Sequence, residues 1–267
     1  TCFVWGNSVG IIQPGFFIVK NSLRGPDQSK SNVIDKFLNG NSNWERFTWM
    51  KEIDGVIYKR NYLFNSISKS IITSQVEGWM DEILFIMWGE LQLKPITNGK
   101  KCLLIIDNFS GHKTDAVRKF FSSNNVLIRY MPPWSTSILQ PMDLVVNSVL
   151  KQQVRKYRGK QIYDEFQNHL SLYGVERLNS KRFLTGFTVS KPDIVSILMI
   201  IHSTLNDFAE NEKFQESVRK VFNNLGYGSE GNIELNKIMK DGKDGNKFSC
   251  RDMLIGLDFE RGERHEC

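Results

Sequence analysis

The spacing of apolar and polar residues predicts both strands and helices along this chain of 267 residues. Short β-rich runs at residues 2–5 and 16–19 are separated by glycine and proline, which predicts a hairpin or two neighbouring strands. Residues 22–40 are rich in Asn, Ser, Gly and Asp and predict a long surface loop, with a short helix at 33–38. A further short strand is predicted at residues 56–58.

The period of an amphipathic helix is clearest at residues 74–91, where apolar side chains recur at the i, i+3, i+4 and i+7 spacing. Ser74 and Glu77 fit a capping box at its start. This apolar stripe is typical of a helix that faces a core. Gly159 is expected to end a later helix. The same period predicts further helices at residues 114–123, 142–157, 162–170, 194–208 and 214–225.

The centre of the chain has the order strand, helix, strand. Leu103–Ile106 is a continuous apolar run, which predicts a strand buried on both faces, as in the middle of a sheet. The helix at 114–123 and a strand at 126–130 follow. This order implies a right-handed parallel crossover, so we expect an α/β fold.

Two aspartates flank this unit and are candidate metal ligands. Asp107 ends the apolar strand, and Asp143 lies near the start of the next helix. Each could instead have a structural role, because a strand-end acid can cap a turn and an acid in a first helical turn complements the dipole. If the crossover brings them together, two carboxylates suit divalent cations that activate water in phosphodiester cleavage.

The motifs around these acids carry a family resemblance. Residues 104–112 read Leu-Ile-Ile-Asp-Asn-Phe-Ser-Gly-His, and residues 131–143 read Met-Pro-Pro-Trp-Ser-Thr-Ser-Ile-Leu-Gln-Pro-Met-Asp. Together they resemble the DDE endonuclease domain of pogo, Tigger and jerky-type transposases, weakly over residues 1–225 and strongly in the middle. The resemblance implies an RNase H-like fold with a mixed five-stranded sheet flanked by helices. It also implies DNA strand cleavage and transfer with Mg²⁺ or Mn²⁺.

The resemblance assigns roles to individual residues. It makes Asp107 and Asp143 catalytic metal ligands, the second and third acids of the family pattern. The first acid of that pattern is expected upstream of Thr1. His112 either organises the loop or takes part in catalysis directly. Asn108 and Gln140 are expected to support the site, as is His112.

Charge and composition favour an anionic partner. The net charge is +6 and the pI is about 9.0, which suits an anionic partner. The family resemblance implies that this partner is DNA and that the protein is located in the nucleus. Trp134 could stack on an unpaired base or plug its own loop. The basic side chains of one predicted helix could follow DNA phosphates or form a solvated face. They are Lys151, Arg155, Lys156 and Arg158.

The sequence lacks the motifs of several other classes, and an unrelated α/β hydrolase or kinase is therefore a poor alternative. No apolar run approaches the ~20 residues of a membrane helix, and the four cysteines form no zinc-finger spacing. There is no G-x-S-x-G motif and no P-loop. A non-catalytic DNA-binding or interaction protein, derived from a domesticated or decayed transposase, is the alternative function. A homo-oligomer is compatible with either function.

Three regions are expected along the chain. Residues 1–160 would form the RNase H-like endonuclease core without its first strand. Residues 161–227 would form the C-terminal helical part of the same domain. Residues 228–267 are polar and are expected to form a flexible tail.

Overall fold

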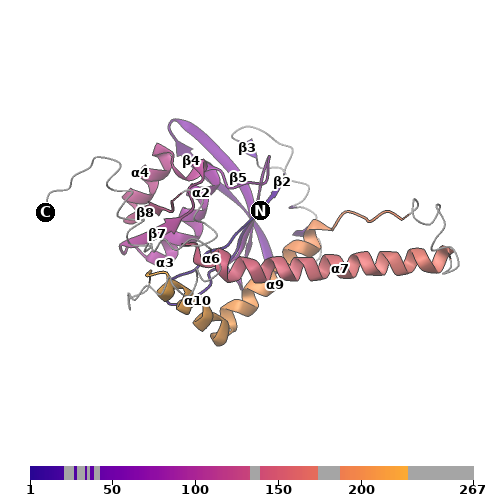
Figure 1. Ribbon diagram of the computed structural model, residues 1–267. Coiled ribbons are helices and arrows are strands. Elements are labelled where there is room, and N and C mark those ends of the chain that lie inside the picture. The colour runs from indigo at the N-terminus through magenta and orange to yellow at the C-terminus, as the bar shows by residue number, and fades with distance from the viewer. Residues whose placement is uncertain are drawn as a thin grey trace.

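The computed structural model has an α/β architecture in which a mixed sheet is flanked by helices (Figure 1). This confirms the predicted α/β class with a mixed sheet and flanking helices. The five-stranded sheet implied by the family resemblance is wrong in detail, because the described strands form one sheet of six and one of two. Trp134, the predicted tail at 228–267 and most of the predicted loop at 22–40 lie outside the described residues. The structure describes residues 1–20, 27–28, 34, 37–38, 43–132, 139–173 and 187–227.

The larger sheet has six strands. Its main path is β1-β2-β6-β5-β3, and β4 pairs with β5 beside this path. β1 and β2 are antiparallel neighbours, as predicted, whereas β2 and β6 are parallel. The strands are β1 (Cys2–Phe3), β2 (Phe16–Lys20), β3 (Asp27–Gln28), β4 (Trp44–Ile53), β5 (Val56–Asn65) and β6 (Ile71–Gln75).

The β4–β5 hairpin was largely missed by sequence reasoning. The predicted strand at 56–58 is only the beginning of β5, and its partner β4 was not predicted. The two strands are joined by Asp54 and Gly55, both with positive φ, at 50° and 79°. Two such residues in succession are the signature of a two-residue hairpin turn, and Asp-Gly is a favoured pair there. The turn chemistry was therefore readable from the sequence.

The smaller sheet contains β7 (Cys102–Ile106) and β8 (Val126–Tyr130), which pair in parallel. Helix α4 (Asp115–Ser123) connects them and begins at Thr114, whose side chain caps the Val117 N–H. The strand-helix-strand order is thus confirmed. The prediction that β7 is a central strand is wrong, because among the described strands it pairs with β8 alone, and Leu103 is 56% exposed. An apolar run indicates hydrophobicity, not the number of neighbouring strands.

The helix predicted at residues 74–91 is wrong in its first part. Ser74 lies in β6, where it pairs with Val19, so the predicted capping box does not form. Helix α2 (Glu82–Trp88) begins at Asp81, whose carboxylate accepts a hydrogen bond from the Leu84 N–H at 2.8 Å. The chain continues through a π-helical turn at Gly89–Leu93 and the short helix α3 (Lys94–Thr97).

Helices cover both faces of β2 because its side chains alternate between two cores. Phe16 and Ile18 join a core with α2, α4 and β7, in which Phe85 stacks on Trp88 at 5.3 Å between ring centroids. Phe17 joins the opposite core, which includes the beginning of α7 together with α9 and α10. Each core contains fully buried aromatic side chains, so the sheet is held from both sides.

The C-terminal helices largely follow the prediction. α9 (Ile194–Glu210) begins at the N-cap Asp193, and α10 (Glu212–Asn224) ends just before Leu225. α6 (Pro141–Leu144) is a single turn that precedes α7 (Val146–Tyr173). None of the described helices is long and apolar enough to cross a membrane.

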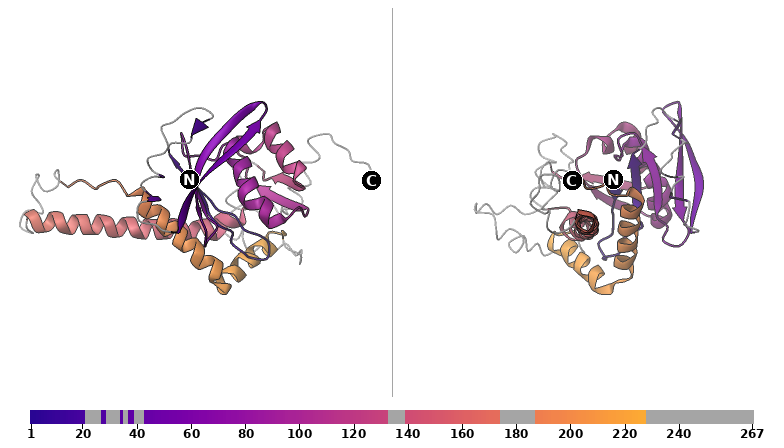
Figure 2. Two further views of the ribbon diagram at one scale, coloured as in Figure 1. Left: turned by 180° about the vertical axis from the view of Figure 1, so that it is seen from behind. Right: turned by 90° about the vertical axis from the view of Figure 1, so that its right-hand side faces the viewer.

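α7 is one continuous helix of 28 residues that projects from the body of the molecule (Figures 1 and 2). The prediction that Gly159 ends a helix is therefore wrong, and the helices predicted at 142–157 and 162–170 belong largely to this one helix. Glycine in a helix interior costs only about 1 kcal/mol relative to alanine, so the flanking residues can sustain the helix through it.

Replacing Gly159 with alanine is expected to raise the free energy of unfolding by about 0.5–1 kcal/mol, because alanine has less backbone freedom to lose. Nothing lies within 4 Å of the added Cβ atom. Urea denaturation followed by circular dichroism would measure the change. Gly55→Ala is the matched control: it also has open space, but its φ of 79° disfavours alanine. Changes of the same sign in both variants would contradict the explanation.

Candidate active site

Asp107 immediately follows the last residue of β7. The backbone there is held by the Ile106 carbonyl, which accepts a hydrogen bond from the Met131 N–H at 2.8 Å. The side chain of Asp107 is 41% exposed. This confirms that an acid ends the strand, and it leaves the carboxylate partly accessible to solvent.

His112 holds one oxygen of this carboxylate. Its Nδ1 lies 3.0 Å from Asp107 Oδ1, and the Phe109 N–H approaches the same oxygen at 3.5 Å. The hydrogen bond from His112 is the main reason that the pKa of Asp107 lies below its ordinary value of 3.8. Asp107 therefore stays ionised to more acidic pH than an ordinary aspartate.

The imidazole of His112 is buried and fixed in place. Its ring centroid lies 4.3 Å from that of Phe85 and 5.4 Å from that of Phe109. The Tyr130 hydroxyl donates a hydrogen bond of 2.6 Å to the His112 carbonyl. Within the described part of the chain, His112 Nε2 is buried without a hydrogen-bond partner. The ring therefore interacts with polar groups through Nδ1, on the Asp107 side.

Asp143 lies in the first turn of α6, as the sequence predicted for an acid at a helix start. Its N–H donates to the Gln140 carbonyl at 3.0 Å, and the Asn147 side-chain amide donates to Asp143 Oδ1. Gln140 is the N-cap residue but makes no side-chain capping bond. Asn147 was not predicted, although it stands four residues after Asp143, the spacing at which helical side chains meet.

The segments that carry the two acids pack against a shared hydrophobic cluster. Ile105 of β7 and Leu144 of α6 both contact the cluster of Met131, Leu139 and Leu225. Among the described residues, no group of three or more His, Cys, Asp and Glu side chains is arranged to hold a metal ion. The convergence of the two carboxylates on one cleft remains a prediction, as do the supporting roles of Asn108 and Gln140.

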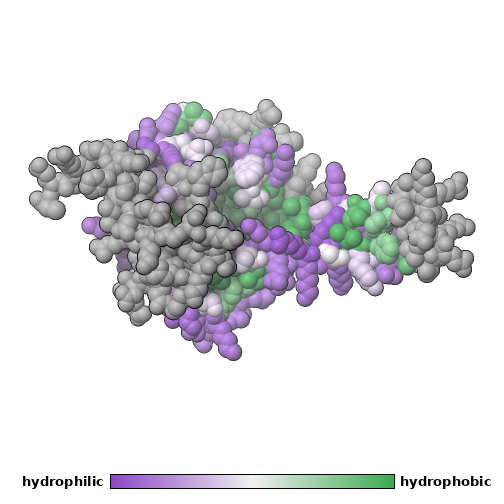
Figure 3. All heavy atoms as spheres, in the orientation of Figure 1, coloured by the Kyte–Doolittle hydropathy of each residue, from purple (hydrophilic) through white to green (hydrophobic). Residues whose placement is uncertain are grey.

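Two of the four predicted DNA-contacting residues of α7 line the same groove. Lys151 and Arg155 line a groove of about 410 Å³. Lys156 is exposed and does not line the groove. Arg158 does not line it either, and its guanidinium donates a hydrogen bond of 2.8 Å to Gln161. Hydrophilic residues gather along α7 beside the body (Figure 3). The groove is lined by Cys2, Val4, Asn147, Leu150, Lys151, Val154, Arg155 and Ile201.

Asn147 connects this groove to Asp143. It lines the groove and also donates to the Asp143 carboxylate. Asn147 therefore contacts Asp143 of α6 and lines the same groove as Lys151 and Arg155 of α7. Because the groove walls are mainly apolar, they suit a ligand with both an anionic and a less polar part.

Comparison with known proteins gives a family match and two curated relatives. The sequence model of the DDE superfamily endonuclease matches residues 56–202, which contain both acids. A human protein described as "Pogo transposable element with KRAB domain" is 36% identical over 81 residues, covering 29% of this chain and 13% of that protein. A Cochliobolus lunatus protein described as "MFS-type transporter clz9" is 35% identical over 79 residues, covering 28% of this chain and 8% of that protein. The chain thus aligns with a small part of either relative.

Proposed function

Because the chain belongs to the DDE superfamily endonuclease family, we propose that it is the nuclease part of a transposase-type protein that cleaves and transfers DNA strands. The main supporting observation is the Asp107 carboxylate at the end of β7, which accepts a hydrogen bond from His112 Nδ1 within the matched segment. A pogo-derived human relative also supports this function. With DNA as the proposed partner, the nucleus is the proposed location.

Mg²⁺ or Mn²⁺ is the proposed cofactor. Asp107 and Asp143 offer hard carboxylate oxygens, and Asp107 is partly accessible. Mg²⁺ is commonly bound by one or two carboxylates together with water and substrate phosphates, so this donor set fits the ion. When bound, such an ion activates water and stabilises the leaving oxygen.

The residues of this chain would prepare the site for the ion and DNA. His112 directs one oxygen of Asp107 toward its own Nδ1 and leaves the second oxygen for another ligand. Asn147 does the same for Asp143. Partners of this kind typically orient metal-binding carboxylates, so we assign both as positioning residues. Asn108 and Gln140 would support the same two turns.

DNA would lie along α7 beside the acids. Lys151 and Arg155 border the groove that Asn147 shares with the Asp143 region. Phosphates held there would follow the helix toward the carboxylates, with positive charge supplying most of the affinity. Lys156 and Arg158 would add to the field more distantly. Trp134 is retained as a candidate base-stacking residue.

Replacing Lys151 and Arg155 together with glutamine is expected to weaken duplex DNA binding. Loss of two phosphate contacts should reduce the slope of log affinity against log salt by up to about 1.8. Fluorescence anisotropy over a salt series would measure this. The control is Lys100→Gln with Lys101→Gln, the same charge change at exposed positions just before β7, the strand that Asp107 follows. Equal loss in the two double variants would reject a specific role for α7.

A non-catalytic DNA-binding or interaction protein is the second candidate. It is supported by the groove along α7, because Lys151 and Arg155 could bind phosphates there without a metal ion. The two functions differ in metal affinity. DNA binding without measurable Mn²⁺ binding by calorimetry, in the absence and presence of DNA, would favour the non-catalytic function.

A further inference from the structure

Trp79 presents a large aromatic side chain to solvent just before α2 begins. The residue is 62% exposed. Its backbone is nevertheless fixed, because Gln75 Oε1 accepts hydrogen bonds from the N–H groups of Glu77 at 2.7 Å and Trp79 at 3.3 Å. Gly78 between them has a φ of 72°, a left-handed conformation that glycine adopts without strain. The chain therefore holds the backbone of Trp79 in place and leaves its side chain exposed.

Phe109 is a second partly exposed aromatic residue, and it lies beside the Asp107 carboxylate. It is 42% exposed, and its N–H lies 3.5 Å from Asp107 Oδ1. The position of its ring depends on Gly111, because a Cβ atom at that residue would lie 2.9 Å from the Phe109 ring. The ring thus rests against a stretch of backbone that only glycine leaves free. Phe109 is therefore positioned next to any group that binds at Asp107.

Gly111 is the point at which the segments of the two aromatic residues meet. The same Cβ position lies 3.5 Å from the carbonyl oxygen of Met80, the residue that directly follows Trp79. Helix α2 also contacts the turn at Ser110–His112. The Phe109 ring and the backbone next to Trp79 are therefore neighbours. We call Trp79 and Phe109 the aromatic pair.

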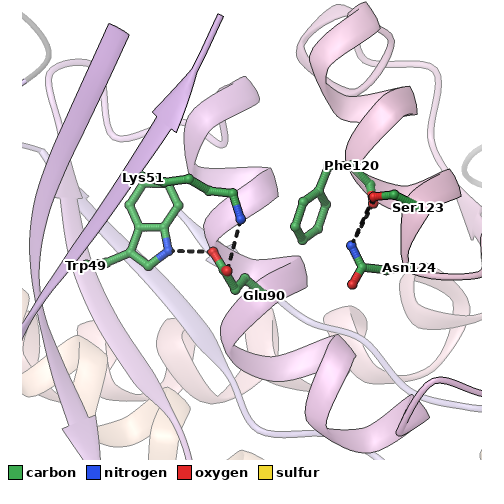
Figure 4. A network of polar contacts seen from close by, with 6 residues as sticks. All are labelled: Trp49, Lys51, Glu90, Phe120, Ser123 and Asn124. Carbon is green, nitrogen blue, oxygen red and sulfur yellow. Dashed lines mark hydrogen bonds and ion pairs between the residues drawn. The ribbon is translucent and has the colours of Figure 1, made fainter. Parts of the chain in front are cut away.

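The far end of the helical stretch that follows Trp79 is anchored to the sheet. Glu90, in the π-helical turn after α2, accepts a hydrogen bond of 2.9 Å from Trp49 Nε1 and pairs with Lys51 Nζ at 2.9 Å (Figure 4). Lys51 Nζ also lies 4.7 Å from the ring centroid of Phe120 in α4. These contacts join β4, the π-helical turn and α4. The aromatic pair is thus carried by a firmly packed part of the fold.

The surroundings of the aromatic pair suit an unpaired nucleotide. Aromatic rings stack on the faces of nucleobases, and in a duplex these faces are covered by the neighbouring base pairs. Lys113, directly after His112, supplies positive charge for a phosphate, and its Nζ lies 5.6 Å from the Tyr130 ring centroid. Two aromatic side chains beside a carboxylate and a lysine suit a protein partner less well, because such a partner typically covers a larger apolar patch.

We propose that the aromatic pair is a binding site for unpaired nucleotides, in which bases next to a phosphate at Asp107 stack on Trp79 and Phe109. The site gives the protein a preference for duplexes with a single-stranded overhang over blunt duplexes. This inference rests on the proposed function, because it requires DNA to be bound at the Asp107 site. Each stacked base is expected to strengthen binding about 5- to 150-fold.

The test is fluorescence anisotropy on the 267-residue chain without divalent metal, with a blunt duplex and the same duplex carrying a single-stranded overhang. The wild type should bind the overhang duplex more tightly. Trp79→Ala should lose most of this preference and keep its affinity for the blunt duplex, whereas Trp79→Phe keeps an aromatic face and most of the preference. Tyr163→Ala is the matched control. It removes a residue that is 61% exposed on the projecting part of α7, and it should change neither affinity.

Gly111→Ala tests the geometry without removing either ring. Its Cβ atom would displace the Phe109 ring, so the preference for the overhang duplex should fall and the affinity for the blunt duplex should remain. Equal affinity of the wild type for the two duplexes would overturn this inference alone. So would an undiminished preference in Trp79→Ala, or a loss of the same size for both duplexes. A wild type that binds neither duplex would refute the proposed function as well.

Discussion

Replacing Asp107 with asparagine is expected to reduce the proposed DNA cleavage by at least roughly a hundredfold to a thousandfold. Losses of this size commonly follow removal of one electrostatic group from an active site. Asparagine keeps the shape of the side chain and can still accept from His112, so the change removes mainly the negative charge that a divalent ion needs. Plasmid nicking with Mg²⁺ or Mn²⁺ would measure it.

The control for this prediction is the same substitution at Asp54. That residue lies in the hairpin turn with a φ of 50°, a conformation that asparagine also adopts readily. Asp54→Asn should therefore preserve cleavage. Calorimetry of Mn²⁺ binding separates the causes, because Asp107→Asn should lose affinity for the ion as well as activity. Cleavage at the wild-type rate in Asp107→Asn would remove this residue from the proposed site.

The local features around Asp107 could be predicted because they depend on neighbouring residues. An apolar run followed by an acid predicted the end of a strand. The helical spacing of apolar residues in α4, between two strand-like runs, predicted that β7 and β8 are parallel. The partners of the acids were harder to predict. His112 lies only five residues from Asp107, so a contact between the two side chains could be inferred from the sequence. The hydrogen bond from the Tyr130 hydroxyl to the His112 carbonyl joins residues that are 18 positions apart. No local pattern contains that contact.

The main errors in the fold prediction came from sequence patterns that are compatible with either a helix or a strand. Ser74 and Glu77 resemble a helix cap, but Ser74 is fully buried in β6 beside Val19 of β2. Trp79 fitted the predicted helical stripe but is 62% exposed before α2 begins. Pairing with a distant strand decided the conformation of this segment. Its effect outweighed local helix propensity, as tertiary contacts often do.

β4 shows the opposite difficulty, because its pattern is weak by itself. Only Trp44 and Trp49 are buried in this strand, and they lie five residues apart. Such a spacing does not give the alternation expected of a strand with one buried face. The strand is specified by its turn and by its pairing with β5. Trp44 and Trp49 belong to different hydrophobic clusters. The strand can therefore be recognised from its apolar residues only when the packing on both faces of the sheet is known.

Replacing His112 with phenylalanine is expected to lower the affinity for Mn²⁺ about 10- to 100-fold, the usual effect of losing a residue that orients a metal ligand. Phenylalanine can occupy the space beside Phe85 and Phe109, but it cannot donate to Asp107. The pKa of Asp107 should rise toward its ordinary value of 3.8, because its largest stabilising contact is lost. Calorimetry at several pH values would measure both effects.

The direction of the pH effect follows from the carboxylate. In the wild type the lowered pKa keeps Asp107 ionised to lower pH, and its stabilising pairing is lost only as the pH falls through that value. In His112→Phe the loss of Mn²⁺ binding on acidification should therefore begin at a higher pH. A purely packing role predicts no such displacement.

His112→Asn is the complementary variant, because it keeps a hydrogen-bond donor for Asp107 and loses the packing of the ring. Its amide can donate in place of Nδ1, but the smaller side chain leaves space among the surrounding aromatic rings. We expect lower thermal stability than in His112→Phe, together with Mn²⁺ affinity and a pH profile closer to the wild type. If phenylalanine preserved the pH profile and asparagine displaced it, His112 would act through packing, and its role in positioning Asp107 would be refuted.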